Sequence, residues 1–243
     1  MMVWAIFRRE LAAYFQTPLA YVFTVVYLVL SGVFTFYFGH FFERGQADLA
    51  AFFTFQPWLF LVLMPAVSMR LWAEEYKCGS VELLLTLGLS RWQVTFGKFL
   101  AAWLFTGLAL VLTFPLWLTV NYLGEPDNGV ILAAYVGCWL MAGAYLAVGV
   151  FVSSTTANQV VAFIITVSLC AAFVVAGSPI IMDFFPAGLD RDWWSALAGI
   201  SFLVRFDAIS KGVLDLGDLC FFLLMMLLWL LASVAVIDSR RTA

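Results

Sequence analysis

The chain has 243 residues with a formal net charge of −3, and 65% of the residues are hydrophobic while only 11% are charged. Its mean hydropathy is +1.02. A soluble domain carries about 25% charged residues, so these values exclude a water-soluble globular protein. A membrane-spanning helix takes roughly 20 apolar residues, and the length therefore accommodates about six spans in a single domain, residues 1–243.

Residues 1–16 predict a helix that lies flat on the inner leaflet as an elbow before the first span. Its apolar side chains recur every three or four residues, as on one helix face, and two arginines lie beside them. The alternative is a frayed basic N-terminus. The apolar residues are Trp4, Phe7, Leu11 and Tyr14, and the arginines are Arg8 and Arg9.

Six apolar runs predict an all-α membrane protein with six transmembrane helices. Pro57 and Pro65 predict a kink in the second span, while Gly137, Gly143 and Gly149 predict close helix packing along the fourth. The polar run from residue 153 to 159 predicts a turn, and residues 70–98 separate the second and third spans. The predicted spans are residues 19–38, 52–69, 99–118, 131–151, 160–181 and 219–236.

Residues 74–92, the coupling segment, form the longest charged interval between two apolar runs. Ser80, which follows Gly79, is a good helix N-cap, and Glu82 then lies in the first turn, where the helix dipole favours an anion. The leucines that follow give a short helix with an apolar face, which fits a groove on a soluble partner. The alternative is an amphipathic helix that only rests on lipid.

Residues 182–218 form a long segment between the fifth and sixth predicted spans. Apolar side chains keep helical spacing from Phe202 to Leu216, and Asp207 and Lys211 make an i,i+4 pair in the favourable order. This pattern indicates a re-entrant or outer-leaflet helical segment that caps a pathway. The alternative is an anchor that lies on lipid and gates nothing.

The 12 Lys and Arg residues divide unevenly between the two predicted faces of the membrane. Eight lie on the face that holds both termini and four on the other. The positive-inside rule therefore places both termini in the cytoplasm. The eight are Arg8, Arg9, Arg70, Lys77, Arg91, Lys98, Arg240 and Arg241, and the four are Arg44, Arg191, Arg205 and Lys211.

Motifs for catalysis and nucleotide binding are absent from the sequence. It contains no GxxxxGK[ST] phosphate loop, no HExxH and no GxSxG, and no predicted span has an ionisable residue at its centre. The four cysteines are scattered, which predicts free thiols and no zinc site. We therefore expect no catalytic residue, no metal and no cofactor bound by this chain.

The run RLWAEEYKCGSVELLLTLGLSRWQVTFGKFLAAWLF resembles the core motif of ABC-2-type permeases, closest to the gliding-motility-associated (GldF-like) permease subunits and related to NosY-like permeases. Ser80 stands where Thr is usual, and Gly88 where Pro is common. Near the C-terminus, residues 205–207 replace a His-Phe-Glu of the family. The matching residues are Glu74, Glu75, Lys77, Gly79, Glu82, Leu83, Leu84, Leu85, Thr86, Gly97 and Lys98.

The resemblance implies a permease subunit in the bacterial inner membrane, assembled with a second permease copy as a homodimer and with an ABC ATP-binding subunit that holds the ATP and Mg. A periplasmic GldG-like protein is a further implied partner, and no nucleic acid is expected. The alternatives are ATP-driven mechanotransmission to a periplasmic partner without substrate transport, and an autonomous carrier. The residues assigned to ATPase coupling are Glu74, Glu75, Lys77, Gly79, Ser80, Glu82, Leu83, Leu84 and Thr86, and those assigned to an outer gate or periplasmic partner are Arg205, Phe206, Asp207 and Lys211.

Overall fold

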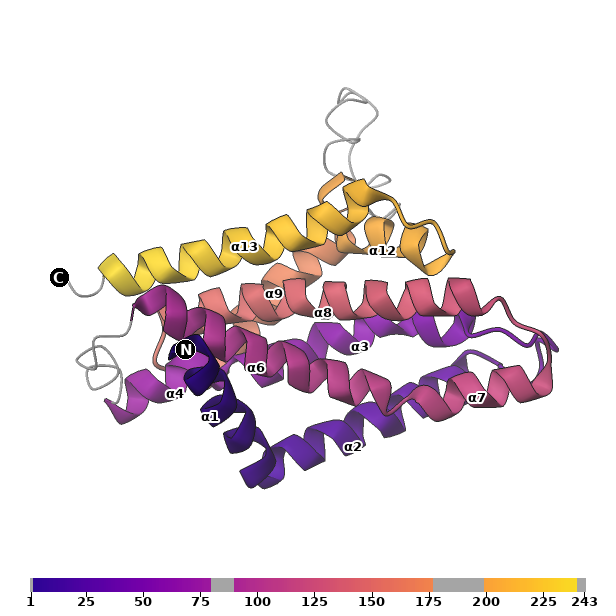
Figure 1. Ribbon diagram of the computed structural model, residues 1–243, viewed down its shortest axis with the longest axis horizontal. Helices are drawn as coiled ribbons and strands as arrows, with labels where there is room; N and C mark the ends of the chain where they lie inside the picture. The colour runs from indigo at the N-terminus through magenta and orange to yellow at the C-terminus, as the bar shows by residue number, and fades with distance from the viewer. Residues whose placement is uncertain (1, 80–89, 177–198, 240–243) are drawn as a thin grey trace.

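The computed structural model describes residues 2–79, 90–176 and 199–239, and the regular elements of these residues are all helices. Figure 1 shows long helices that run side by side, with the beginning of the first helix and the end of the last helix near the same end of the bundle. In chain order the elements are α1 (Met2–Gln16), α2 (Pro18–Val33), the π-helix η1 (Phe34–Phe38), α3 (Ala50–Ser68), α4 (Arg70–Cys78), α6 (Arg91–Val111), α7 (Phe114–Leu123), α8 (Asn128–Thr155), α9 (Gln159–Val175), α12 (Phe202–Ser210) and α13 (Leu216–Ser239).

Among the described residues, five helical stretches are long and apolar enough to cross a membrane: Ala20–Phe38, Ala50–Cys78, Arg91–Leu123, Asn128–Thr155 and Leu216–Ser239. The helix α9 is apolar, but its 17 residues fall short of that length. Five of the six predicted spans are therefore matched. The remaining one, residues 160–181, extends beyond residue 176, where this described part of the chain ends.

The helix α8 lies at the centre of the bundle and packs against α3, α4, α6, α9, α12 and α13. In its most apolar stretch 72% of the residues are buried, against 17% in the first span. The glycine prediction is confirmed: Gly137 lies against Ile209, Gly143 against Met226 and Gly149 against Ser68. A Cβ at Gly143 would lie only 2.6 Å from the Met226 methyl carbon, so the missing side chains allow three different neighbours to approach α8 closely.

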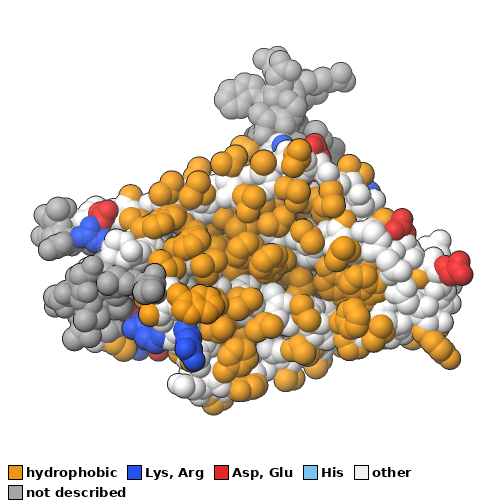
Figure 2. Space-filling model, viewed as in Figure 1, with side chains coloured by type: hydrophobic (Ala, Val, Ile, Leu, Met, Phe, Trp, Pro, Cys, Tyr) orange, Lys and Arg blue, Asp and Glu red, His pale blue; other side chains and the backbone are white. Residues whose placement is uncertain are grey.

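The exposed surface suits lipid. Hydrophobic side chains cover the middle of the face visible in Figure 2, and charged side chains lie at its margins. The exposed apolar residues include Tyr21, Val25 and Val29 of α2 and Leu224 and Leu228 of α13. Such a surface would aggregate in water, whereas hydrocarbon solvates it. We call the end that holds α1, α4 and the start of α6 the basic end, after Arg9, Arg70, Arg91 and Lys98.

Several predicted helix boundaries are wrong, and the causes are local. The third span begins at Arg91 rather than residue 99, because Ser90 and Gln93 form a capping box that starts the helix in the charged interval. The second span continues past residue 69: only Met69 interrupts the helical path from α3 into α4. The predicted turn at residues 153–159 is shorter, because Ser153 to Thr155 remain helical.

The apolar side of the N-terminal helix, predicted to lie on lipid, is divided between the surface and the interior of the protein. Trp4 is 66% exposed, whereas Ile6 and Tyr14 are buried. The helix turns the side that carries Ile6, Glu10 and Tyr14 toward its neighbours, and α6 is the main one. These residues are four apart, which places them on one helix face. The exposed Trp4 and Arg8 are then left on the outer side, as expected of a helix at a membrane surface.

Candidate functional site

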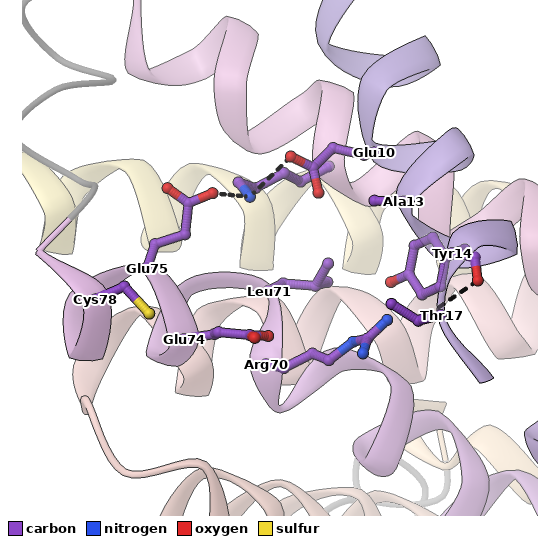
Figure 3. Close-up of a pocket in the computed structure, with 10 residues that line it drawn as sticks. Glu10, Ala13, Tyr14, Thr17, Arg70, Leu71, Glu74, Glu75 and Cys78 are labelled. Atoms are coloured by element: carbon purple, nitrogen blue, oxygen red, sulfur yellow. Dashed lines mark hydrogen bonds and ion pairs between the residues drawn. The ribbon is translucent and has the colours of Figure 1, made fainter. Parts of the chain in front are cut away.

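A buried ion-pair cluster joins three helices at the basic end. Lys98 on α6 places its Nζ atom 2.5 Å from Oε1 of Glu75 on α4 and 3.2 Å from Oε1 of Glu10 on α1. Figure 3 shows the two carboxylates and the ion pairs that join them across the site. The three residues, which we call the ion cluster, connect segments that are 88 and 23 residues apart in sequence.

The adjacent residues Gly97 and Lys98 allow α6 to form the ion cluster with α1 and α4. Gly97 lets α1 approach α6, since a Cβ there would lie 2.9 Å from the Cγ2 atom of Ile6. Lys98, the next residue, is a long chain whose stem is buried among apolar neighbours and whose Nζ atom lies 5.7 Å from the centre of the Trp72 ring. The Gly-Lys pair therefore combines close helix contact with a buried positive charge.

The ion cluster is largely removed from solvent. The Lys98 side chain is only 2% exposed and those of Glu10 and Glu75 are 15% exposed. Arg9, which is 54% exposed, adds a second positive charge at 2.5 Å from Glu10 and 3.8 Å from Glu75. Two carboxylates thus face two cations, and this balance offsets the desolvation that isolated buried charges would suffer.

The pKa of the Glu10 carboxyl group reflects this balance between burial and nearby positive charge. Burial alone would raise the pKa of this carboxyl group, but Lys98 and Arg9 together outweigh burial and lower its pKa below the ordinary value of 4.5. The carboxyl group is therefore ionised at neutral pH, as its ion pairs require. Burial raises the pKa of the Tyr14 hydroxyl, which stays neutral.

A cavity of about 300 Å³ opens beside the ion cluster, between α1 and α4. Figure 3 shows Arg70 next to Tyr14, and the Arg70 guanidinium carbon lies 5.2 Å from the centre of the Tyr14 ring. The Tyr14 hydroxyl makes no hydrogen bond to any residue that the structure describes. The cavity is lined by Glu10, Ala13, Tyr14, Thr17, Arg70, Leu71, Glu74, Glu75, Cys78 and Lys98.

Four of the residues assigned to ATPase coupling lie in the described structure. Glu75 belongs to the ion cluster, whereas Glu74 and Lys77 are exposed on α4. Gly79 ends α4 with φ of 68°, a left-handed conformation that favours glycine. Ser80, Glu82, Leu83, Leu84 and Thr86 lie outside the described residues, as does the predicted short helix that contains them.

The residues assigned to an outer gate or partner do not share one environment. Phe206 is 3% exposed and packs inside the bundle, so it presents no surface to a partner. Arg205 joins α12 to α13 through Asp218, with Nη1 2.7 Å from Oδ1. Asp207 and Lys211 form the predicted i,i+4 pair on the surface.

Two members of the ion cluster were not anticipated in this role. Glu10 was missed because the spacing of Trp4, Phe7, Leu11 and Tyr14 indicated a side of the helix that lies on lipid and did not reveal the side that packs on α6. Lys98 was identified only as a motif residue at a span boundary. A usable signal did exist: Glu10 is the one acidic residue of α1, and it lies four residues from both Ile6 and Tyr14, on the same face of the helix.

A family model described as an ABC-2 family transporter protein matches residues 4–190, more than half of the chain. No curated protein matches the chain. The matched range includes α1, α4 and the start of α6, and therefore all three members of the ion cluster. Among the described residues, no group of three or more His, Cys, Asp and Glu side chains is placed to hold a metal ion.

Proposed function

Since the chain belongs to the ABC-2 transporter family as a membrane component, we propose that it passes the movement of a separate ATP-binding subunit to its own transmembrane helices. Members of this family typically lack ATPase activity themselves and work with an ATP-binding subunit. ATP and Mg accordingly belong to that partner. The coupling segment, residues 74–92, is the part of this chain that we assign to the contact.

The observation that carries the proposal is the connection of α4. This helix continues the second span across Met69 and is tied by Glu75 to Lys98 in the third span and to the elbow helix α1. A push on α4 therefore reaches the second span along the chain itself, and it reaches the third span and the elbow through ion pairs. Coupling between distant sites needs such a contiguous physical connection.

We further propose the assembly and placement of the protein. Two copies form the membrane part in a bacterial inner membrane, with both termini in the cytoplasm, and the whole chain serves as one transmembrane domain. In this arrangement α9 and the residues after it complete a sixth span. The resemblance of the coupling segment to GldF-like permeases supports membership of that subgroup, with export as the form of transport.

Pull-down of a co-expressed ABC ATP-binding subunit tests the contact. Replacing Leu83 and Leu84 by Asp should abolish the association. Replacing Val213 and Leu214 by Asp is the matched control: these are also adjacent and apolar, they are exposed, and they belong to the connection between α12 and α13. Association that survives the first change unaltered would overturn the coupling assignment.

The orientation is tested with the native cysteine Cys78, which is exposed at the end of α4. In a variant that keeps Cys78 alone, an impermeant thiol reagent should label it only after the cells are opened. A variant in which Glu125→Cys is the single cysteine should be labelled in intact cells. Labelling of Cys78 from outside would reverse the proposed orientation.

Mechanotransmission without transport is the second candidate, and one observation favours it. The apolar cavity between α2, α3 and α6 measures about 20 Å³, room for about one water molecule. A solute path at this place would need a large opening. In proteoliposomes, ATP turnover that requires a periplasmic partner and moves no solute would favour this candidate over export.

A further inference from the structure

One serine of the central helix is bonded to the junction between the second span and the coupling segment. The Ser153 hydroxyl on α8 donates to the Met69 carbonyl at 2.9 Å. It also accepts hydrogen bonds from the backbone amides of Trp72 and Ala73, each at 3.0 Å. Ser153 is fully buried, so water does not compete for these three bonds.

These bonds give α4 the cap that its own sequence lacks. A helix start leaves amide groups without partners, and an N-cap side chain normally accepts from the second or third of them. Met69 holds the N-cap position of α4 but makes no side-chain cap bond in the described structure. Trp72 is the third residue of α4, and its amide is bonded by Ser153 instead. The cap of α4 therefore comes from another helix.

The neighbouring residues hold α8 against the same junction. Gly149, one turn before Ser153, lies directly against Ser68, the last residue of α3. The Ser68 hydroxyl is directed back to the Met64 carbonyl of its own helix at 2.9 Å. A glycine and a serine four residues apart thus form a small-residue contact at which α8 touches both sides of Met69.

We propose that Ser153 is a positioning residue that fixes the start of α4, and with it the coupling segment, onto the central helix α8. The transport role of this contact rests on the proposed function; the bonding itself does not. Through Ser153 a displacement of α4 acts on α8, which packs against α13, α3, α12, α6 and α9. The ion cluster connects α4 to α1 and α6 through Glu75, so α4 is held to α8 at its start and to α1 and α6 further along.

Hydrogen exchange of the full-length protein in lipid nanodiscs tests the bonding. Ser153→Ala should make the Trp72 and Ala73 amides exchange about tenfold faster, because two buried donors lose their acceptor. Ser154→Ala is the matched control: Ser154 is equally buried, and its hydroxyl donates within α8 to the Phe151 carbonyl. Ser153→Thr, which keeps a hydroxyl, should restore most of the protection. Equal exchange in S153A and S154A would overturn the proposal.

Reconstitution with an ABC ATP-binding subunit tests the positioning role. S153A should bind that subunit as tightly as the wild type but lose at least fivefold of the ATPase stimulation that the permease provides, while S154A keeps it. Spin labels on the exposed Cys78 and Cys220 should show a broader distance distribution in S153A. Unchanged stimulation with accelerated exchange would overturn the positioning role alone. A wild-type protein that neither binds nor stimulates the subunit would overturn the proposed function, and the exchange result would be unaffected.

Discussion

The two ends of the helical bundle hold their buried charges in different ways. At the basic end, the ion cluster joins three helices, and its lysine is only 2% exposed. At the opposite end, Arg205 pairs with Asp218 across α12 and α13, but the arginine is 33% exposed. The first arrangement connects segments 88 residues apart and the second connects segments 13 apart. The basic end is therefore where charge fixes the relative positions of distant elements.

Removing the lysine of the ion cluster should produce the largest effect. Lys98→Met removes the buried cation that Glu10 and Glu75 share, and breaking a buried ion pair by removing one partner costs about 3–5 kcal/mol. Thermal unfolding of the purified protein in detergent measures the loss. The triple variant K98M/E10Q/E75Q removes the charges together and should recover most of the stability. A single variant as stable as the wild type would show that the cluster does not hold the helices.

Replacing glycines of the central helix α8 by alanine compares how tightly the helices pack at the two ends of the bundle. Gly149→Ala should cost about 1–3 kcal/mol, because overpacking a filled contact is destabilising, and a Cβ there overlaps Ser68. Gly137→Ala should cost less, since a Cβ at the opposite end would lie 2.7 Å from the Cγ2 atom of Ile209 and 3.3 Å from its Cβ, whereas a Cβ at residue 149 would lie 2.5 Å from the Cβ of Ser68. Gly32→Ala is the control, because nothing lies within 4 Å of its Cβ position. Equal losses at 149 and 32 would contradict the close contact.

Breaking the pair at the opposite end should have a smaller effect than breaking the ion cluster. Arg205→Ala removes the bond to Asp218, the bond of its Nε atom to the Gly199 carbonyl at 3.1 Å and the contact with the Phe221 ring. We expect a loss of about 1–2 kcal/mol, because Asp218 lies at a helix start and water reaches the exposed arginine site. A loss as large as that of K98M would mean that the two ends are equally dependent on charge.

Acid should act on the basic end through Glu10. Its pKa is lowered in the folded protein, so its contribution to stability is fully present above the ordinary value of 4.5. That contribution is lost as the pH falls through the lowered pKa. The melting temperature should therefore vary little with this group from pH 7 to 5 and fall below pH 4.5, and Glu10→Gln should flatten that fall. An E10Q profile that matches the wild type below pH 4.5 would contradict the assignment.

The sequence predicted the bundle well and the ion cluster poorly, for different physical reasons. Lipid requires long apolar helices, so spans such as residues 131–151 can be identified from the sequence alone. The boundaries depend on individual groups: the Ser90–Gln93 capping box starts α6 at Arg91, and the charge of Lys98 indicated a boundary at residue 99 although Lys98 is paired inside α6. Contacts between residues far apart leave no local pattern, and Ser153 in a polar run indicated a turn rather than a cap for α4.

The smallest effect should come from the exposed pair on α12. Lys211→Ala removes an i,i+4 partner of Asp207 when the two side chains are 68% and 57% exposed, and such pairs contribute about 0.3–0.5 kcal/mol. Salt separates this pair from the ion cluster, because exposed charges are screened within about 3 Å at 1 M salt and buried ones much less. Unfolding measured in low and in 1 M salt should therefore show the K211A difference disappear while the K98M difference remains. If the K98M difference also disappeared, water would have access to the cluster, and α4 would no longer be held by buried charge.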